Sequence, residues 1–225
     1  MFARTAWTVF RKDLTVEVRT RETLATTLFF ALSAVIVFAV ALVRDGRVVA
    51  DAAAGILWVA IAFAGTLTLG RTFERERYTD TLRALLLAPA PRAAIYVGKL
   101  LAVVAVLLLT ELMLVPLVAL LFDAALLQRP GLLVALLVTG TIGFASVGTL
   151  FAAMLVRARS RDVLLPVLLY PITIPVIIAG VRGTAALAQL VPDEPMATFW
   201  VMLLAAFDTV FVTLALWTFD PLMTD

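Results

Sequence analysis

The sequence predicts an all-α integral membrane protein, with six transmembrane helices preceded by an amphipathic helix at the membrane surface. Hydrophobic residues make up 63% of the 225 positions and the mean hydropathy is +1.08, whereas soluble domains are about 45–50% apolar. Six apolar stretches are each long enough to cross the roughly 30 Å hydrocarbon core of a bilayer. The loops between them are too short to hold a core, so we expect a single membrane domain over residues 1–225.

Residues 1–23 are expected to form the surface helix on the cytoplasmic side. They include five Lys and Arg residues, and their apolar side chains recur at helical spacing: Trp7, Phe10, Leu14 and Val18. Basic residues beside such an apolar stripe are typical of interfacial helices. A secretory signal peptide is disfavoured, because the apolar run that follows spans residues 24–43 and exceeds the usual length of about 7–15 residues.

The transmembrane region is expected over residues 24–219. Its six apolar stretches are Leu24–Val43, Ala52–Gly70, Leu100–Phe122, Leu132–Val156, Val163–Val181 and Ala197–Phe219. Fourteen of the 18 Lys and Arg residues precede the first stretch or lie in the segments 71–99 and 157–162. By the positive-inside rule, both termini are cytoplasmic, including the tail at 220–225. We therefore expect a multi-pass protein of the cytoplasmic (inner) membrane.

The segment 71–99, RTFERERYTDTLRALLLAPAPRAAIYVGK, is the longest charged interruption in the chain and is predicted to be cytoplasmic. It begins with acids and bases in alternation, among them Glu74 and Glu76. An apolar set then recurs at the spacing of one helix face: Tyr78, Leu82, Leu85 and Leu86. Pro89 and Pro91 end this helix, since proline has no backbone N–H to donate.

Two interpretations of the segment 71–99 are open. It is either a solvated basic loop that only fixes the orientation of the protein in the membrane, or a docking helix for a soluble partner. The apolar face is about two turns, roughly 10 Å, in length. It favours docking, because a loop without a partner would leave this face in water.

The fifth apolar stretch carries a signal for helix bending. Pro171 and Pro175 each remove a backbone hydrogen bond, one turn apart, and this predicts a kink. The kink is either a static bend or a moving element. In the fourth stretch, TGTIGFASVGTLFAAM has small residues at the spacing that lets another helix approach closely.

Two carboxylic acids, Glu111 and Asp208, are predicted near the middle of the bilayer. Each is the twelfth residue of a 23-residue apolar stretch, where an acid costs about 2.5–3.5 kcal/mol on insertion scales. They either form a polar lining for a passage or a subunit interface, or are protonated acids bonded to nearby backbone carbonyls. We favour the first interpretation, because ionisable residues inside membranes are functional by default.

Several kinds of chemistry are excluded by residues that the chain lacks. It has no cysteine and no histidine, so the usual ligands of zinc and haem iron are missing. It has no P-loop, since Gly98 and Lys99 are preceded by Ala93 where the motif needs glycine. A G-x-S-x-G hydrolase elbow is also absent, and a net charge of +2 gives no reason to expect nucleic acid. We expect no enzyme, and no cofactor or metal bound by this chain.

The motifs, in their order and spacing, resemble the haem exporter protein B (CcmB) family. The resemblance rests on FRKDL at residues 10–14, the segment 71–99, the acid Glu111, and GTLFAAM and LLPVLLYPITIPVIIAG in the fourth and fifth stretches. It implies the fold of an ABC exporter permease and a role in cytochrome c maturation, with haem exported or released in an ATP-driven step. Phe10 and Asp13 match an F-x-x-D pattern of the family, which implies a place beside the ATPase.

The resemblance also implies three partners: a cytoplasmic ABC ATPase, a second membrane subunit that handles haem, and a periplasmic haem chaperone. The segment 71–99 would then be the coupling segment that meets the ATPase. Because the chain has neither histidine nor cysteine, we expect a mechanical role. ATP is used by the partner, and haem is a passenger held by a partner.

Two alternatives to this function are open. One is an ABC exporter permease for another substrate, such as a lipid, a drug or a polysaccharide. The other is a membrane scaffold without transport. An ATPase and cytochrome c assembly proteins that co-purify with the chain would distinguish these alternatives.

The charge distribution predicts where a reporter that is active only in the cytoplasm will work. It should be active when fused to the carboxyl terminus or inserted at Pro91, and inactive when inserted at Asp193, because the positively charged loops stay inside. Reporter activity in whole cells measures this. Activity at Asp193 would contradict the six-helix orientation.

Overall fold

The computed structural model describes residues 1–44, 47–48, 52–74, 91–156 and 158–222. Within these ranges the α-helices are α1 (Phe2–Thr20), α2 (Glu22–Ala41), α3 (Ala53–Arg71), α6 (Arg92–Leu121), α7 (Pro130–Met154), α8 (Arg161–Leu187) and α9 (Glu194–Leu222). The shorter elements are the strands β1 (Val43–Arg44) and β2 (Arg47–Val48) and the 3-10 helix η2 (Leu126–Gln128).

The prediction of an all-α membrane protein is confirmed. Six of the helices, α2, α3 and α6 to α9, are long and apolar enough to cross a bilayer, and they coincide with the six predicted stretches. The small exception is the antiparallel pair β1–β2, in which Val43 lies opposite Val48. The helix α6 starts at Arg92, so the last part of the segment 71–99 is helical and continuous with the third span.

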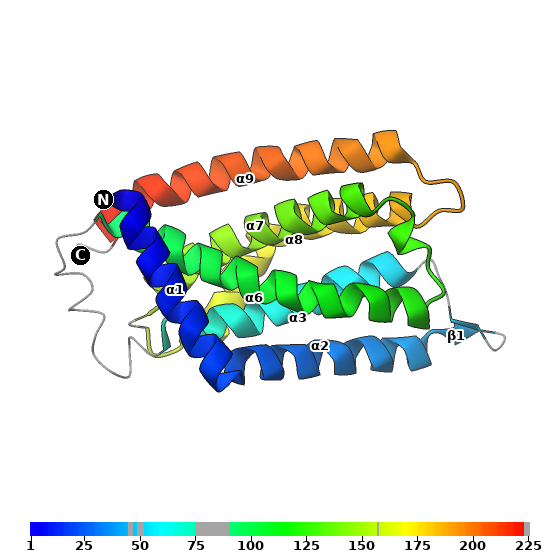
Figure 1. Ribbon diagram of the computed structural model, residues 1–225, viewed down its shortest axis with the longest axis horizontal. Helices are drawn as coiled ribbons and strands as arrows, with labels where there is room; N and C mark the ends of the chain where they lie inside the picture. Colours follow the sequence, from blue (N-terminus) through cyan, green and yellow to red (C-terminus); the bar gives the residue numbers. More distant parts are fainter. Residues whose placement is uncertain (45–46, 49–51, 75–90, 157, 223–225) are drawn as a thin grey trace.

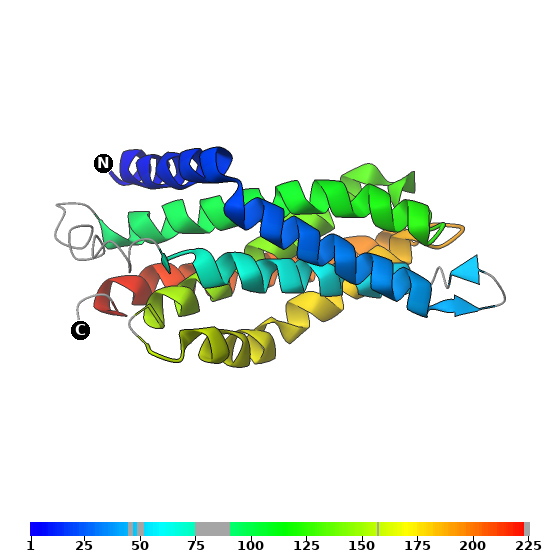
Figure 2. The ribbon, with the colours of Figure 1, turned by 90° about the horizontal axis from the view of Figure 1, so that it is seen from below.

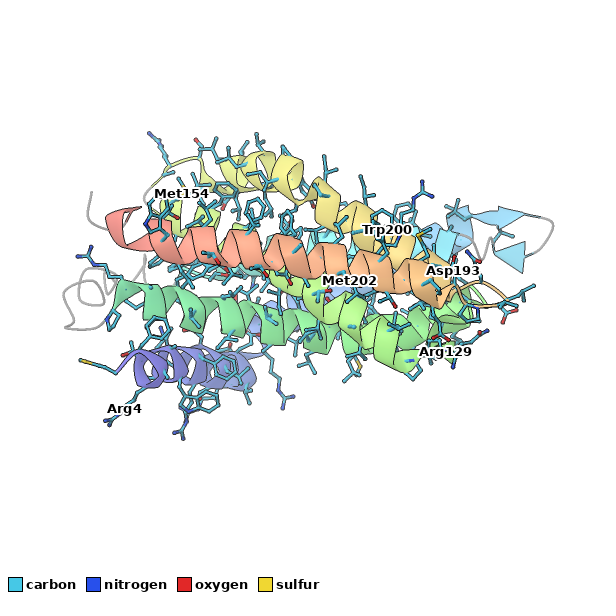
Figure 3. All side chains as sticks on the ribbon, turned by 90° about the horizontal axis from the view of Figure 1, so that it is seen from above. Arg4, Arg129, Met154, Asp193, Trp200 and Met202 are labelled. Atoms are coloured by element: carbon cyan, nitrogen blue, oxygen red, sulfur yellow. The ribbon has the colours of Figure 1, made fainter. Side chains whose placement is uncertain are left out.

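The six long helices lie side by side along the long axis of the molecule, and both termini lie at the same end (Figure 1). The β1–β2 hairpin lies at the opposite end. The first helix, α1, forms a separate layer that packs on the outside of α6 near the end with the termini (Figure 2). Arg129 and Asp193 lie at one end of the molecule, and Arg4 of α1 lies at the other end (Figure 3).

The centre of the bundle is organised around Trp58 of α3, which is only 2% exposed. Its Nε1 donates a hydrogen bond to Oγ1 of Thr184 on α8, at 2.9 Å. The indole ring lies where a Cβ atom would sit on Gly140 of α7 or on Gly180 of α8. One large side chain therefore fills a slot between three helices, and only glycine leaves room for it on two of them.

Two further close contacts join α3 to α7, and each helix supplies the large side chain in one of them. Leu69 of α3 occupies the space beside Gly148 of α7, and Phe144 of α7 occupies the space beside Gly65 of α3. The small residues of the fourth predicted stretch thus receive large side chains from α3. This interlocking fixes the position of α3 along α7.

The helix α8 stays a single helix although Pro166, Pro171 and Pro175 lie inside it. Its ribbon changes direction along its length (Figure 2). Near these prolines, the Thr173 hydroxyl donates to the carbonyl of Leu169 at 3.0 Å.

Adding one methyl group at Gly140 should destabilise the bundle. The Cβ atom of Gly140→Ala would overlap the Trp58 ring, and overpacking of a core typically costs about 1–3 kcal/mol. Gly55→Ala is the matched control, because no atom lies within 4 Å of its Cβ position. Thermal unfolding in detergent should show a lower Tm for Gly140→Ala and an unchanged or higher Tm for Gly55→Ala. Equal Tm values would contradict the slot.

Candidate functional site

A buried lysine at the root of the segment 71–99 joins three elements. Lys99 of α6 is 2% exposed, and its Nζ lies 2.9 Å from Oδ2 of Asp13 on α1. The same ammonium donates to the carbonyl of Thr72, just beyond α3, at 2.9 Å, and lies 5.0 Å from the centre of the Phe73 ring. We call these four residues, Asp13, Thr72, Phe73 and Lys99, the Lys99 cluster. It ties α1 to both ends of the segment 71–99.

The residue before Lys99 allows α1 to come this close. A Cβ atom on Gly98 would lie 2.7 Å from the carbonyl oxygen of Ala6 and 2.7 Å from Cβ of Val9, so only glycine leaves room for α1 here. Ala6 and Val9 are buried, and with Asp13 they form the face of α1 that packs on α6. Trp7, in the predicted apolar stripe, is 60% exposed and lies on another side of α1.

The carboxyl-terminal end of α3 is bound by a second buried cation. Arg161, the first residue of α8, is 3% exposed. Its guanidinium donates to the carbonyls of Leu69, at 3.3 Å, and of Gly70. The last carbonyls of a helix carry partial negative charge and attract cations. The three positively charged regions of the sequence, 1–23, 71–99 and 157–162, therefore meet at the end of α3.

A sharp corner between α1 and α2 sets the angle of α1. Arg21 adopts a left-handed backbone conformation with φ of 53°. Glu17 of α1 reaches past this corner, and its Oε1 accepts a hydrogen bond from the backbone N–H of Leu24 at 2.7 Å. An unpaired N–H at the start of α2 is thereby satisfied. Glu22, the first residue after this corner, forms an ion pair at 3.4 Å with Arg71 at the end of α3.

The predicted ATPase-coupling residues that the structure describes lie in different surroundings. Asp13 belongs to the Lys99 cluster, whereas Phe10 is half-buried and packs against Trp7, with ring centres 5.3 Å apart. Glu74 is half-buried just beyond the cluster. The remaining predicted residues lie outside the described part of the chain: Glu76, Tyr78, Leu82, Leu85 and Leu86. The docking helix therefore stays a prediction.

Sequence reasoning missed Lys99, Thr72, Phe73 and Arg161. In the sequence Lys99 stands out only as part of an incomplete P-loop, but its place on the same helix face as the apolar Tyr96 and Val103 is a usable signal. A lysine on the buried face of a membrane helix must have partners, because an isolated buried charge is expensive. The identity of those partners depends on the fold.

The two midplane acids approach the same helix from different sides. Glu111 is 2% exposed, and its Oε1 accepts a hydrogen bond from the hydroxyl of Thr141 on α7. Oδ1 of Asp208 lies 2.7 Å from the Cβ position of Gly143, also on α7. Thr141 and Gly143 are two residues apart, about 200° around a helix. In the described part of the chain, Oε2 of Glu111 and Oδ1 of Asp208 are buried without a hydrogen-bond partner.

The structure gives no converging set of ligands for a metal among the residues that it describes. No group of three or more Asp and Glu side chains gathers there. Two methionines that could be weak ligands of haem iron, Met154 and Met202, lie well apart, at the end of the bundle and along α9 (Figure 3).

Removing the buried lysine should destabilise the protein far more than removing its exposed neighbour. Lys12 and Lys99 each lie 2.9 Å from the Asp13 carboxylate, but Lys12 is 49% exposed. Lys99→Met should lower the free energy of unfolding by about 2–3 kcal/mol, less than for a fully buried pair because Asp13 is 20% exposed. Lys12→Gln should cost less than about 1 kcal/mol. Denaturant titration in detergent measures both, and equal losses would contradict the cluster.

Comparisons with known proteins agree with the resemblance seen in the sequence. The family model described as CcmB protein matches residues 4–221. The chain is 31% identical over 190 residues to "Heme exporter protein B" of Rhodobacter capsulatus, covering 83% of this chain and 87% of the relative. For the protein of the same name in Haemophilus influenzae, the identity is 30% over 173 residues, 76% of each chain.

The match to "Heme exporter protein B" of Escherichia coli K12 is shorter. It is 31% identical over 96 residues, so it covers 43% of this chain and 44%, less than half, of the relative. The family model nevertheless extends over nearly the whole sequence, through α1 and all six long helices. The chain therefore belongs to the CcmB protein family.

Proposed function

We propose that this chain is the membrane subunit of an ABC transporter complex that serves cytochrome c maturation. The observation that carries the proposal is the family match over residues 4–221, because relatives in that family are named as haem exporters. Two features support a permease rather than an enzyme: the six long apolar helices and the absence of a P-loop from the sequence. ATP is hydrolysed in a separate cytoplasmic subunit.

The Lys99 cluster gives this function a physical basis. The ATPase docks on the segment 71–99, with Tyr78, Leu82, Leu85 and Leu86 as the apolar contact. A displacement of that segment moves α3 and α6 together, because Lys99 of α6 donates a hydrogen bond to the Thr72 carbonyl at the end of α3. It also reaches α1 through Asp13. Asp13 thus serves to position α1, and α1 moves with the segment.

Haem is the passenger of this complex and is held by its partners. The sequence offers neither histidine nor cysteine as an axial ligand. A second membrane subunit and a periplasmic chaperone therefore supply the haem ligands. This chain converts ATP-driven movement into release, with both termini on the cytoplasmic side.

The two midplane acids form a polar lining whose surroundings change with this movement. Glu111 and Asp208 lie on either side of α7, so a shift of α7 changes the surroundings of both. Each has a buried oxygen atom without a hydrogen-bond partner in the described part of the chain. Such an atom is costly unless the acid is protonated or meets a partner's donor group.

Deletion and restoration of this chain in its own host tests the proposed function. Deletion should abolish covalent haem attachment to c-type cytochromes, measured by haem stain, and the wild-type chain should restore it. Leu85→Glu should fail to restore it and should lose the co-purifying ATPase, because it would bury an unpaired carboxylate in the docking face. Ala84→Glu, on the opposite side of the same predicted helix, is the matched control and should restore both.

Other outcomes of this experiment identify the alternatives. Normal haem attachment in the deletion strain, together with an ATPase that co-purifies with the wild-type chain, indicates a permease for another substrate. Absence of any co-purifying ATPase from the wild-type chain indicates a scaffold. Either result would overturn the proposal.

Replacing Glu111 by glutamine should separate function from folding. Glu111→Gln keeps the side-chain volume and an oxygen that can accept the Thr141 hydroxyl bond, but it cannot carry a charge. It should accumulate at the wild-type level in an immunoblot and lower haem attachment several-fold. Glu111→Leu is the comparison, since it should also reduce accumulation. Wild-type haem attachment with Glu111→Gln would return this acid to a purely structural role.

A further inference from the structure

A groove runs along α6 beneath α1 and starts at the Lys99 cluster. Its upper part has a volume of about 280 Å³ and lies between α1, the start of α2, the end of α3 and α6. Its lower part, of about 150 Å³, continues between α1, α2 and α6. Leu14, Glu17 and Val106 line both parts, so the two parts adjoin each other along α6.

Charged side chains line the upper part of the groove. Its lining includes three cations, Lys12, Arg71 and Lys99, and two acids, Asp13 and Glu17. Arg71 is also paired with Glu22, and Arg21 adds a fourth cation in the lower part, so these described residues carry one more positive than negative charge over the two parts together. Lys12 and Lys99 each lie 2.9 Å from one of the two oxygens of Asp13. A ligand with one negative charge would balance the groove as a whole.

The lower part is largely apolar, although Glu17 and Arg21 also line it. Val18 and Leu109 line it and are 64% and 45% exposed, so they form an open apolar rim. Ala105 and Val106 form the wall of the groove on α6. From Lys99 to Leu109 the helix rises by about 15 Å. This is a path for a hydrocarbon chain, which a free inorganic anion would not need.

We propose that this groove binds one anionic phospholipid of the surrounding bilayer. Lys12 and Arg71 hold the phosphodiester at the membrane surface, and an acyl chain lies along α6 past Ala105 to Leu109. The bound lipid fills the space between α1 and α6 and so supports the contact made by the Lys99 cluster. This site depends only on insertion in a membrane and not on the identity of the transported substrate.

Titration of the delipidated full-length chain, followed by native mass spectrometry, tests the site. The three probes are dioleoyl phosphatidylglycerol, dioleoyl phosphatidylcholine and inorganic phosphate. We expect one phosphatidylglycerol per chain, bound at least fivefold more tightly than phosphatidylcholine, which has the same acyl chains without the net charge. Inorganic phosphate should not bind. Equal affinity for the two lipids, or saturable binding of phosphate alone, would overturn the proposal.

Two substitutions and their controls locate the lipid. Lys12→Gln should weaken phosphatidylglycerol binding about fivefold, as expected for one basic residue at a membrane surface. Ala105→Leu should weaken it about fourfold for each methylene that it displaces from the groove. The controls are Arg4→Gln, an exposed arginine on α1 outside the groove (Figure 3), and Ala119→Leu, a half-buried alanine of α6 outside the groove.

The folded state of each variant is checked by its Tm and by gel filtration. Folded Lys12→Gln and Ala105→Leu that bind phosphatidylglycerol like the controls would place the lipid elsewhere and contradict the proposal.

Discussion

Lys99 brings a positive charge into a place where only 2% of the residue reaches solvent. A charge buried in this way is tolerated only when its partners replace the water that it has lost. The partners are the Asp13 carboxylate of α1 and the Thr72 carbonyl beyond α3. Separating the ammonium from these groups would remove both of these interactions. The surface helix, the third predicted span and both ends of the segment 71–99 therefore keep a fixed relation to one another.

This fixed end is continuous with the packed centre of the membrane region. Leu69 lies in the last turn of α3 and fits against Gly148 of α7. Further along the same helix, Trp58 fits between α7 and α8 and bonds to Thr184. A displacement at the end of α3 therefore meets close contacts along the length of the bundle. Close packing transmits strain rather than absorbing it, which suits the proposed transfer of mechanical work from an ATPase to a membrane partner.

The sequence predicts the parts of this arrangement that depend on composition and period. Six spans follow from hydropathy, because each apolar run must cross the bilayer by itself. The burial of Glu111 follows from its place in such a run. The partner of Lys99 does not follow, because Asp13 lies far away in the sequence and only the fold brings it near. The left-handed backbone conformation of Arg21 could not be predicted from the sequence, because glycine is the residue that usually adopts this conformation.

Hydrogen–deuterium exchange compares the wild-type chain with Lys99→Met and tests most directly whether Lys99 holds α1. The account predicts faster amide exchange in α1 around Val9 and Asp13 in the variant, because loss of the ammonium releases α1 from α6. Exchange at the start of α9, at the end of the molecule far from α1 (Figure 3), should not change. Unaltered protection of α1 in folded Lys99→Met would show that other contacts hold this helix, and it would contradict the central role given to the cluster.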